Sequence, residues 1–177
     1  NHIHSDKTKF VILGIANDWT ERKGLDDFIK LSKQIEINDL IILVGLKRKN
    51  QRLLPKNIIG IPRTENLDEL VDFYNYADVF VNPTWEDNFP TTNLEALACG
   101  TPVITYNTGG SPEAIDAETG FVINQGDIKG LLEAINTVKT KGKSYFSNAC
   151  RERALRHYNK TDRYNDYLHL YQSLLQK

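Results

Sequence analysis

Short apolar runs alternate along this chain with segments of helical periodicity, and this alternation limits the fold more than any other feature. The runs predicted to form strands are residues 10–13, 40–44, 58–61, 79–81, 102–106 and 121–123. Residues 40–44 are continuously apolar, as expected for a strand that is buried on both faces. Strands that alternate with helices predict an α/β fold, a Rossmann-like parallel sheet of about six strands with helices on both faces.

The segments between these runs carry apolar residues at helical spacing. One predicted inner face consists of Leu67, Leu70, Val71 and Tyr74. Further helices are predicted from about residue 25, over about 92–99, over 128–138 and in the tail. The tail carries an apolar stripe made of Tyr164, Tyr167, Leu168, Tyr171, Leu174 and Leu175. The simplest interpretation of this stripe is that it packs into the core.

Length and charge restrict the class of protein. The 177 residues suit one domain, which we place at 10–177 after a disordered or linker start at 1–9. A net charge of −1 gives no reason to expect nucleic acid as a partner. No apolar run approaches the ~20 residues that cross a bilayer, so no transmembrane segment is predicted. The two cysteines, Cys99 and Cys150, lack metal-ligand spacing and are predicted to be free thiols.

The loops that follow the strands are where chemistry is expected. In open parallel sheets the ligand binds outside the carboxyl ends of the strands, where the strand order reverses. The loops at that edge span residues 14–24, 60–66, 84–93 and 106–113.

The loop at 84–93 holds two acids, Glu86 and Asp87, and a helix is predicted to begin near its end. Backbone N–H groups at a helix start are unpaired and attract anions. The alternative is that residues 91–93 cap the helix themselves. Glu95, in the first turn, suits the helix dipole or a capping box. Both the ligand and the capping interpretations remain open at this point.

Two further loops at the same edge add groups that suit a phosphorylated ligand. Arg22 and Lys23 precede Gly24, and a basic pair between a strand and its helix is suited to hold a diphosphate. Gly109 and Gly110 allow a close approach of the backbone, although a tight turn is the simpler interpretation. Cations and amides bind phosphate, and carboxylates accept hydrogen bonds from hydroxyls. Together they indicate a phosphorylated ligand that carries hydroxyl groups.

At these residues the sequence resembles glycosyltransferase family 4, the retaining enzymes with the two-domain GT-B fold. The resemblance covers about residues 10–175 and corresponds to the C-terminal, donor-binding domain. Its most specific segments are residues 77–84, the acidic loop, residues 93–104 and Gly109-Gly110-Ser111-Pro112-Glu113, which appear in the family's order.

The resemblance implies roles for individual residues. Glu95 matches the acid that holds the ribose hydroxyls. The acid that faces the sugar matches Asp87 by spacing, with Glu86 as the alternative. Lys23 matches the phosphate-binding lysine, and Arg22 takes the place of an arginine that the family has earlier in the loop. The remaining donor-binding positions are Asn88, Phe89, Pro90, Thr91, Thr92, Gly109, Gly110 and, next to the base, Ile61, Pro62 and Arg63.

The implied reaction transfers a sugar from a nucleoside diphosphate to a glycan or lipid-linked acceptor, with retention of the anomeric configuration. Neither a metal nor any other cofactor is expected. The resemblance also implies an N-terminal acceptor domain that this chain lacks, so we expect binding without transfer. It places the whole protein in bacterial polysaccharide biosynthesis, in the cytoplasm and peripherally at the inner membrane face. An exposed aromatic tail would then mark the interface with that domain.

Two other functions remain compatible with the sequence. Another GT-B enzyme, such as a sugar-nucleotide epimerase, would convert its substrate without an acceptor. A non-catalytic module would bind a nucleotide without depending on the sugar. A dinucleotide-binding Rossmann domain is disfavoured, because the first strand–helix turn lacks the G-x-G-x-x-G spacing.

Overall fold

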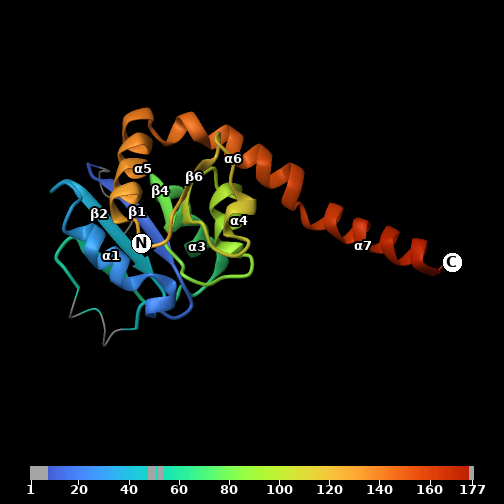
Figure 1. Cartoon of the computed structure of the whole chain (residues 1–177), viewed down its shortest axis with the longest axis horizontal. Coiled ribbons are helices and arrows are strands. Elements are labelled where there is room, and N and C mark those ends of the chain that lie inside the picture. Colours follow the sequence, from blue (N-terminus) through green and yellow to red (C-terminus); the bar gives the residue numbers. More distant parts are fainter. Residues whose placement is uncertain (1–7, 48–50, 52–53, 176–177) are drawn as a thin grey trace.

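The computed structural model, which describes residues 8–47, 51 and 54–175, confirms the α/β prediction. All six strands are parallel, in the order β3-β2-β1-β4-β5-β6 (Figure 1). The strands are β1 (Phe10–Ile15), β2 (Asp39–Val44), β3 (Ile58–Ile61), β4 (Val79–Asn82), β5 (Val103–Tyr106) and β6 (Gly120–Ile123). Strands β1, β2 and β3 follow one another from the centre of the sheet to one edge, and β4, β5 and β6 from the centre to the other edge. Strands β1 and β4 therefore lie side by side at the switch point, where the strand order reverses.

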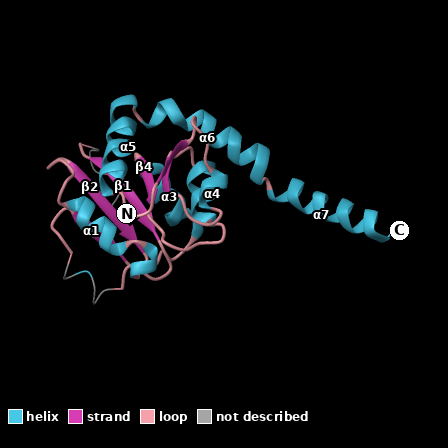
Figure 2. Ribbon diagram, viewed as in Figure 1, coloured by secondary structure: helices cyan, strands magenta, loops and turns pink. Residues whose placement is uncertain are grey.

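Helices cover both faces of this sheet (Figure 2). They are α1 (Leu25–Ser32), α3 (Leu67–Tyr76), α4 (Thr91–Ala98), α5 (Ile128–Lys141), α6 (Lys143–Tyr158) and α7 (Lys160–Leu175), with short 3-10 turns η1 (Glu21–Lys23) and η2 (Ser111–Ala114). Helix α1 contacts α5, and α4 contacts α6. The connections from β1 to β2 and from β4 to β5 run in opposite directions across the sheet. Right-handed crossovers therefore place α1 and α4 on opposite faces.

The core lies between the sheet and these helices. Val11, Ile12 and Leu13 in β1 are fully buried, as the continuous apolar run requires. The predicted inner face of α3 is only partly right, because Tyr74 is buried as predicted, whereas Leu67 is exposed. The helix also buries Phe73, which was not part of the predicted face. Of the predicted linker start, residues 1–7 lie outside the described part of the chain.

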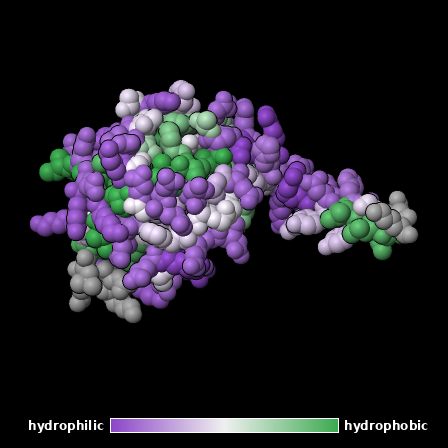
Figure 3. Space-filling view, viewed as in Figure 1, coloured by the Kyte–Doolittle hydropathy of each residue, from purple (hydrophilic) through white to green (hydrophobic). Residues whose placement is uncertain are grey.

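The tail differs from its predicted packing. Helix α7 extends away from the body of the molecule and buries none of its residues. Its tyrosines and leucines are about half exposed or more, from Leu170 at 51% to Leu175 at 86%. Figure 3 shows apolar side chains near the far end of this helix. The interpretation of the stripe as core packing is therefore wrong, and the face stays open.

Both cysteines are free thiols, as predicted, and both are shielded. Burial raises the pKa of Cys150 to about 12 and also raises the pKa of the half-buried Cys99. The Cys150 side chain is therefore almost entirely in the thiol form at neutral pH, and only the thiolate is nucleophilic. We expect slow reaction of the native protein with a thiol-specific disulfide reagent and rapid modification of both residues after unfolding in guanidinium. Rapid native labelling of Cys150 would contradict this packing.

Candidate donor site at the switch point

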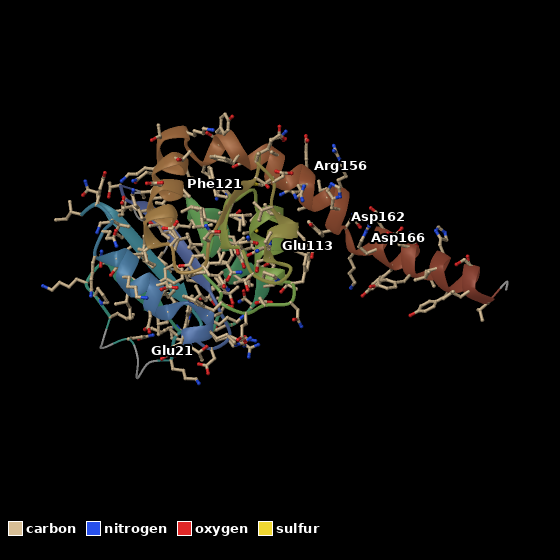
Figure 4. All side chains as sticks on the ribbon, viewed as in Figure 1. Glu21, Glu113, Phe121, Arg156, Asp162 and Asp166 are labelled. Atoms are coloured by element: carbon tan, nitrogen blue, oxygen red, sulfur yellow. The ribbon has the colours of Figure 1, made fainter. Side chains whose placement is uncertain are left out.

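The loops after β1 and β4 meet directly above the switch point. The backbone N–H of Trp85 donates to the carbonyl oxygen of Arg22 at 2.8 Å, and the Thr84 hydroxyl donates to the same oxygen at 3.2 Å. Gly24, at φ +75°, packs so tightly that a Cβ there would overlap the carbonyl of Pro83. The two loops therefore form one unit at the carboxyl edge of the sheet. Figure 4 labels Glu21, which opens the η1 turn of this unit.

The predicted cations and acids pair across this junction. The Lys23 ammonium lies 2.6 Å from the Asp87 carboxylate, and both side chains are mostly buried. Arg22 Nη1 donates at 3.4 Å to the carbonyl oxygen of Glu86, whose side chain is exposed. The structure thus joins Asp87 to the predicted phosphate lysine and leaves Glu86 with Arg22. An open cavity of about 420 Å³ on the Glu86 side is lined by Glu21, Arg22, Asp26, Asp27, Lys30, Trp85 and Glu86.

Helix α4 begins at this junction without a side-chain cap. Its N-cap residue is Pro90, which makes no capping hydrogen bond. Asn93 is fully buried, accepts from the Asn82 amide at 2.9 Å and donates to the Ser111 carbonyl at 3.4 Å. The alternative in which residues 91–93 cap the helix is therefore wrong. Thr91 is exposed and Thr92 half-buried at the start of the helix.

Glu95 has a defined partner on the neighbouring helix. The Tyr74 hydroxyl donates to Glu95 Oε2 at 2.9 Å, and burial together with the charge of Glu95 raises the pKa of Tyr74 well above its usual value. The carboxylate is therefore held from α3 and does not close a capping box. It also lines a mainly apolar groove between α4 and α6, together with Leu94, Ala98, Arg151, Ala154, Leu155, Tyr158 and Asn159.

The two glycines of the 106–113 loop pack against the acidic loop. Gly109 has φ +47°, and a Cβ at this residue would overlap the carbonyl oxygen of Asp87. The N–H of Gly110 donates to the Asn88 carbonyl at 2.8 Å, and a Cβ there would overlap that carbonyl. Close approach between two loops is therefore sufficient to explain both glycines. Asn88 is exposed at this contact, and Phe89 is 36% exposed.

The residues predicted to contact the base lie farther out. Ile61 ends β3, the edge strand, and its carbonyl accepts from the N–H groups of Gly45 and Leu46 at 3.0 and 2.9 Å. Pro62 and Arg63 are exposed after it. Strand β2 separates them from the loop after β1, and the described contacts do not join them to Lys23 or Asp87.

Sequence reasoning missed the residues that hold the acidic loop. The Trp85 indole donates to the buried carboxylate of Asp27 at 2.8 Å, and the Tyr106 hydroxyl donates to the same oxygen at 3.2 Å. The sequence held one indication of these contacts. Asp27 lies beside Phe28 on the inner side of α1, and a charged side chain in that position requires buried hydrogen-bond partners. Trp85 was visible only as the residue before the two acids.

The described residues hold no cluster of three or more histidine, cysteine or acidic side chains arranged to bind a metal ion. Within the same part of the chain, no helix has the length and hydropathy needed to span a bilayer. The predicted absence of a cofactor stays a prediction.

A strand order that reverses between a basic and an acidic loop places a ligand-binding crevice at the carboxyl ends of β1 and β4 in α/β domains of this class. Residues 2–157 match the family model described as Glycosyl transferases group 1, and the chain belongs to this family. The fold is one half of a GT-B fold.

Three similar proteins illustrate the relationship. The capsular polysaccharide biosynthesis glycosyltransferase CapM of Staphylococcus aureus is 28% identical over 134 residues, 70% of this chain and 35% of CapM. Sucrose-phosphate synthase of Thermosynechococcus elongatus superposes with a TM-score of 0.82 at 22% identity, covering 95% of this chain and 46% of the synthase. Anabaena HepE in complex with UDP-glucose superposes with a TM-score of 0.79 at 20% identity, covering 93% of this chain and 49% of HepE. The chain thus spans about a third to a half of the length of these proteins.

Proposed function

We propose that this chain is the donor-binding domain of a retaining family 4 glycosyltransferase, and that it holds a nucleoside-diphosphate sugar above β1 and β4. The observation that carries the proposal is the Lys23–Asp87 pair beside the uncapped start of α4, in a chain of the group 1 family. A cation and free backbone amides at this point of the sheet suit a diphosphate, and the carboxylates suit sugar hydroxyls.

Each group then has one part of the donor to bind. Lys23, Arg22 and the amides near Thr91 and Thr92 hold the diphosphate. Pro90 has no N–H to contribute. Glu95, fixed by Tyr74, accepts hydrogen bonds from the ribose, and Asp87 faces the transferred sugar with the loop of Asn88 and Phe89. The segment after β3, at Ile61, Pro62 and Arg63, faces the base.

The reaction follows from these positions. The bond between the anomeric carbon and the diphosphate oxygen breaks, and a bond to the acceptor oxygen forms on the same face of the sugar. The acceptor proton passes to the departing diphosphate. The positive charge of Lys23 and the dipole of α4 stabilise the charge that develops on the leaving group, so no metal ion or other cofactor is required.

The acceptor belongs to another part of the protein. The matched proteins are two to three times as long as their match with this chain, and we propose an N-terminal domain that binds a glycan or lipid-linked acceptor. The name of the CapM relative supports a role in polysaccharide biosynthesis. We propose, from the resemblance to family 4, that the whole protein does this work in the cytoplasm, peripherally at the inner membrane face. The 177-residue chain should then bind donor without multiple-turnover transfer.

Calorimetric titration with UDP, GDP, ADP and their glucose conjugates tests this function. UDP comes first, because the HepE structure is described as a UDP-glucose complex. We expect saturable binding of one nucleotide and a roughly tenfold loss in Glu95→Ala, because hydrogen bonds to a carboxylate contribute about 1.5 kcal/mol or more.

Tyr74→Phe is the matched control for this substitution, because it removes the Tyr74 hydrogen bond and keeps the carboxylate. It should lower affinity less than Glu95→Ala does. Equal affinity for nucleotide and nucleotide sugar would favour a non-catalytic module instead. An absence of binding to all six compounds would contradict the proposal for this chain.

A further inference from the structure

Asp27 is a buried carboxylate with donors from three different segments. Its exposed fraction is 1%, although it lies on the short surface helix α1 beside the exposed Asp26. Oδ2 accepts from the Trp85 indole at 2.8 Å and from the Tyr106 hydroxyl at 3.2 Å, and Oδ1 accepts from the Lys30 ammonium at 2.9 Å. A buried charge is tolerated only with such partners. The carboxylate therefore joins α1 to β5 and to the acidic loop.

Trp85 is the residue through which this carboxylate reaches the site. Besides its indole bond, its N–H donates to the Arg22 carbonyl at 2.8 Å, and its own carbonyl accepts from Thr108 at 3.0 Å and Gln125 at 2.7 Å. One residue thus connects the loops that follow β1, β5 and β6. Trp85 as a residue is 41% exposed, so packing alone does not hold its side chain in place. The next two residues are Glu86 and Asp87.

We propose that Asp27 is a positioning residue that fixes Trp85. It thereby places the part of the acidic loop from Asp87 to Phe89 against the sugar of the donor. This inference rests on the proposed function. Of the groups assigned to the rest of the donor, Glu95 is held by Tyr74, outside this network. The backbone of Lys23 is fixed within the η1 turn, where its N–H donates to the Thr20 carbonyl at 3.0 Å, and only its ammonium contacts the acidic loop, at Asp87. Asp27 therefore acts mainly on recognition of the sugar, and less on recognition of the nucleotide.

The Tyr106 hydroxyl supports the same arrangement. Burial and the negative charge of Asp27 raise its pKa above the usual tyrosine value, so it remains a donor throughout the working pH range. Its ring also packs edge-on against Trp85, with 6.1 Å between the ring centroids. Removal of the Asp27 charge would leave the indole N–H and this hydroxyl competing for a weaker acceptor.

Asp27→Asn and Trp85→Phe test the inference, with affinity for UDP and for UDP-glucose as the measurement. If the titrations above select another base, the corresponding pair replaces these probes. Each variant should lower the preference for the nucleotide sugar over the nucleotide by about tenfold, the range expected for a hydrogen bond to a charged group. The double variant should lose no more than either single variant, because both remove the same bond.

Asp39→Asn is the matched control. Asp39 is also a buried carboxylate, 2% exposed, and accepts from the Lys139 ammonium at 2.6 Å and the Glu36 N–H at 3.1 Å. It is the first residue of β2 and lies at the amino ends of the strands, on the side of the sheet opposite to the site. This variant should lose thermal stability as Asp27→Asn does and keep the full preference for the nucleotide sugar.

Indole fluorescence gives a second readout that needs no ligand. Trp19, the only other tryptophan in the sequence, is buried and donates to the Val44 carbonyl at 2.9 Å. Acrylamide quenching should rise in Asp27→Asn and stay at the wild-type level in Asp39→Asn. A wild-type chain that binds neither probe nor any other nucleotide would overturn the proposed function. A wild-type chain that binds, with an unchanged preference in Asp27→Asn and Trp85→Phe, would overturn the positioning role alone.

Discussion

Replacing Lys23 by alanine is expected to weaken binding of a nucleoside diphosphate by about 50-fold. The ammonium is the partly buried cation that pairs with Asp87 at the switch point, and a charge-assisted contact with phosphate contributes about 2 kcal/mol or more. The substitution also leaves the Asp87 carboxylate without its partner, so a negative charge then faces the incoming diphosphate. The effect is measured by calorimetric titration with UDP at low and at high salt. Salt screens both the lost attraction of Lys23 for phosphate and the repulsion between Asp87 and the diphosphate, so the difference should shrink at high salt.

Asp87→Asn is the informative control for this pair, because it should act in the opposite direction. It releases Lys23 and removes a like charge, so affinity for UDP should stay equal or rise by about two- to fivefold, while affinity for UDP-glucose falls. A parallel loss of UDP affinity in Lys23→Ala and Asp87→Asn would mean that the pair only supports the loops. Arg22→Ala in the same series decides its role, and unchanged affinity would remove Arg22 from the diphosphate site.

The central part of the sheet was predictable because β1, β2, β4 and β5 are buried on both faces. A strand in that position is largely apolar, as β1 and residues 40–44 of β2 are, and such runs stand out between polar loops. The parallel topology and right-handed crossovers then bring the loops after β1 and β4 together. For that reason the sequence alone placed Lys23 and Asp87 at one edge, and the structure joins them at 2.6 Å.

The interactions within the site were less predictable, because they depend on contacts between distant segments. Asp27 reads as a helix-start acid by local rules, yet its partners lie 58 and 79 residues away along the chain. Asn93 similarly looked like a helix cap and instead bonds Asn82 beneath the helix. In α7, the apolar stripe specified a buried face without specifying what buries it, and the described residues leave that face open.

Gly24→Ala is expected to be the most damaging single substitution at the site. The residue has φ +75° and ψ +27°, a left-handed conformation that costs a non-glycine residue about 1 kcal/mol. The added Cβ would also overlap the backbone carbonyl of Pro83, which lies between β4 and the acidic loop and has little freedom to move. Overpacking of this kind costs a further 1–3 kcal/mol or so, and we expect a total loss of about 3 kcal/mol in the free energy of unfolding.

Gly100→Ala separates the two contributions to that loss. Gly100 also has a positive φ, +69°, but its nearest neighbour to a new Cβ is the Ser147 carbonyl oxygen at 3.3 Å, without overlap. Denaturant unfolding should therefore show a loss of about 1 kcal/mol for Gly100→Ala. Below their unfolding transitions, only Gly24→Ala should weaken nucleotide binding, because its clash pushes Lys23 and Asp87 apart. Equal losses of stability and full binding in both variants would show that the contact between Gly24 and Pro83 does not set the site.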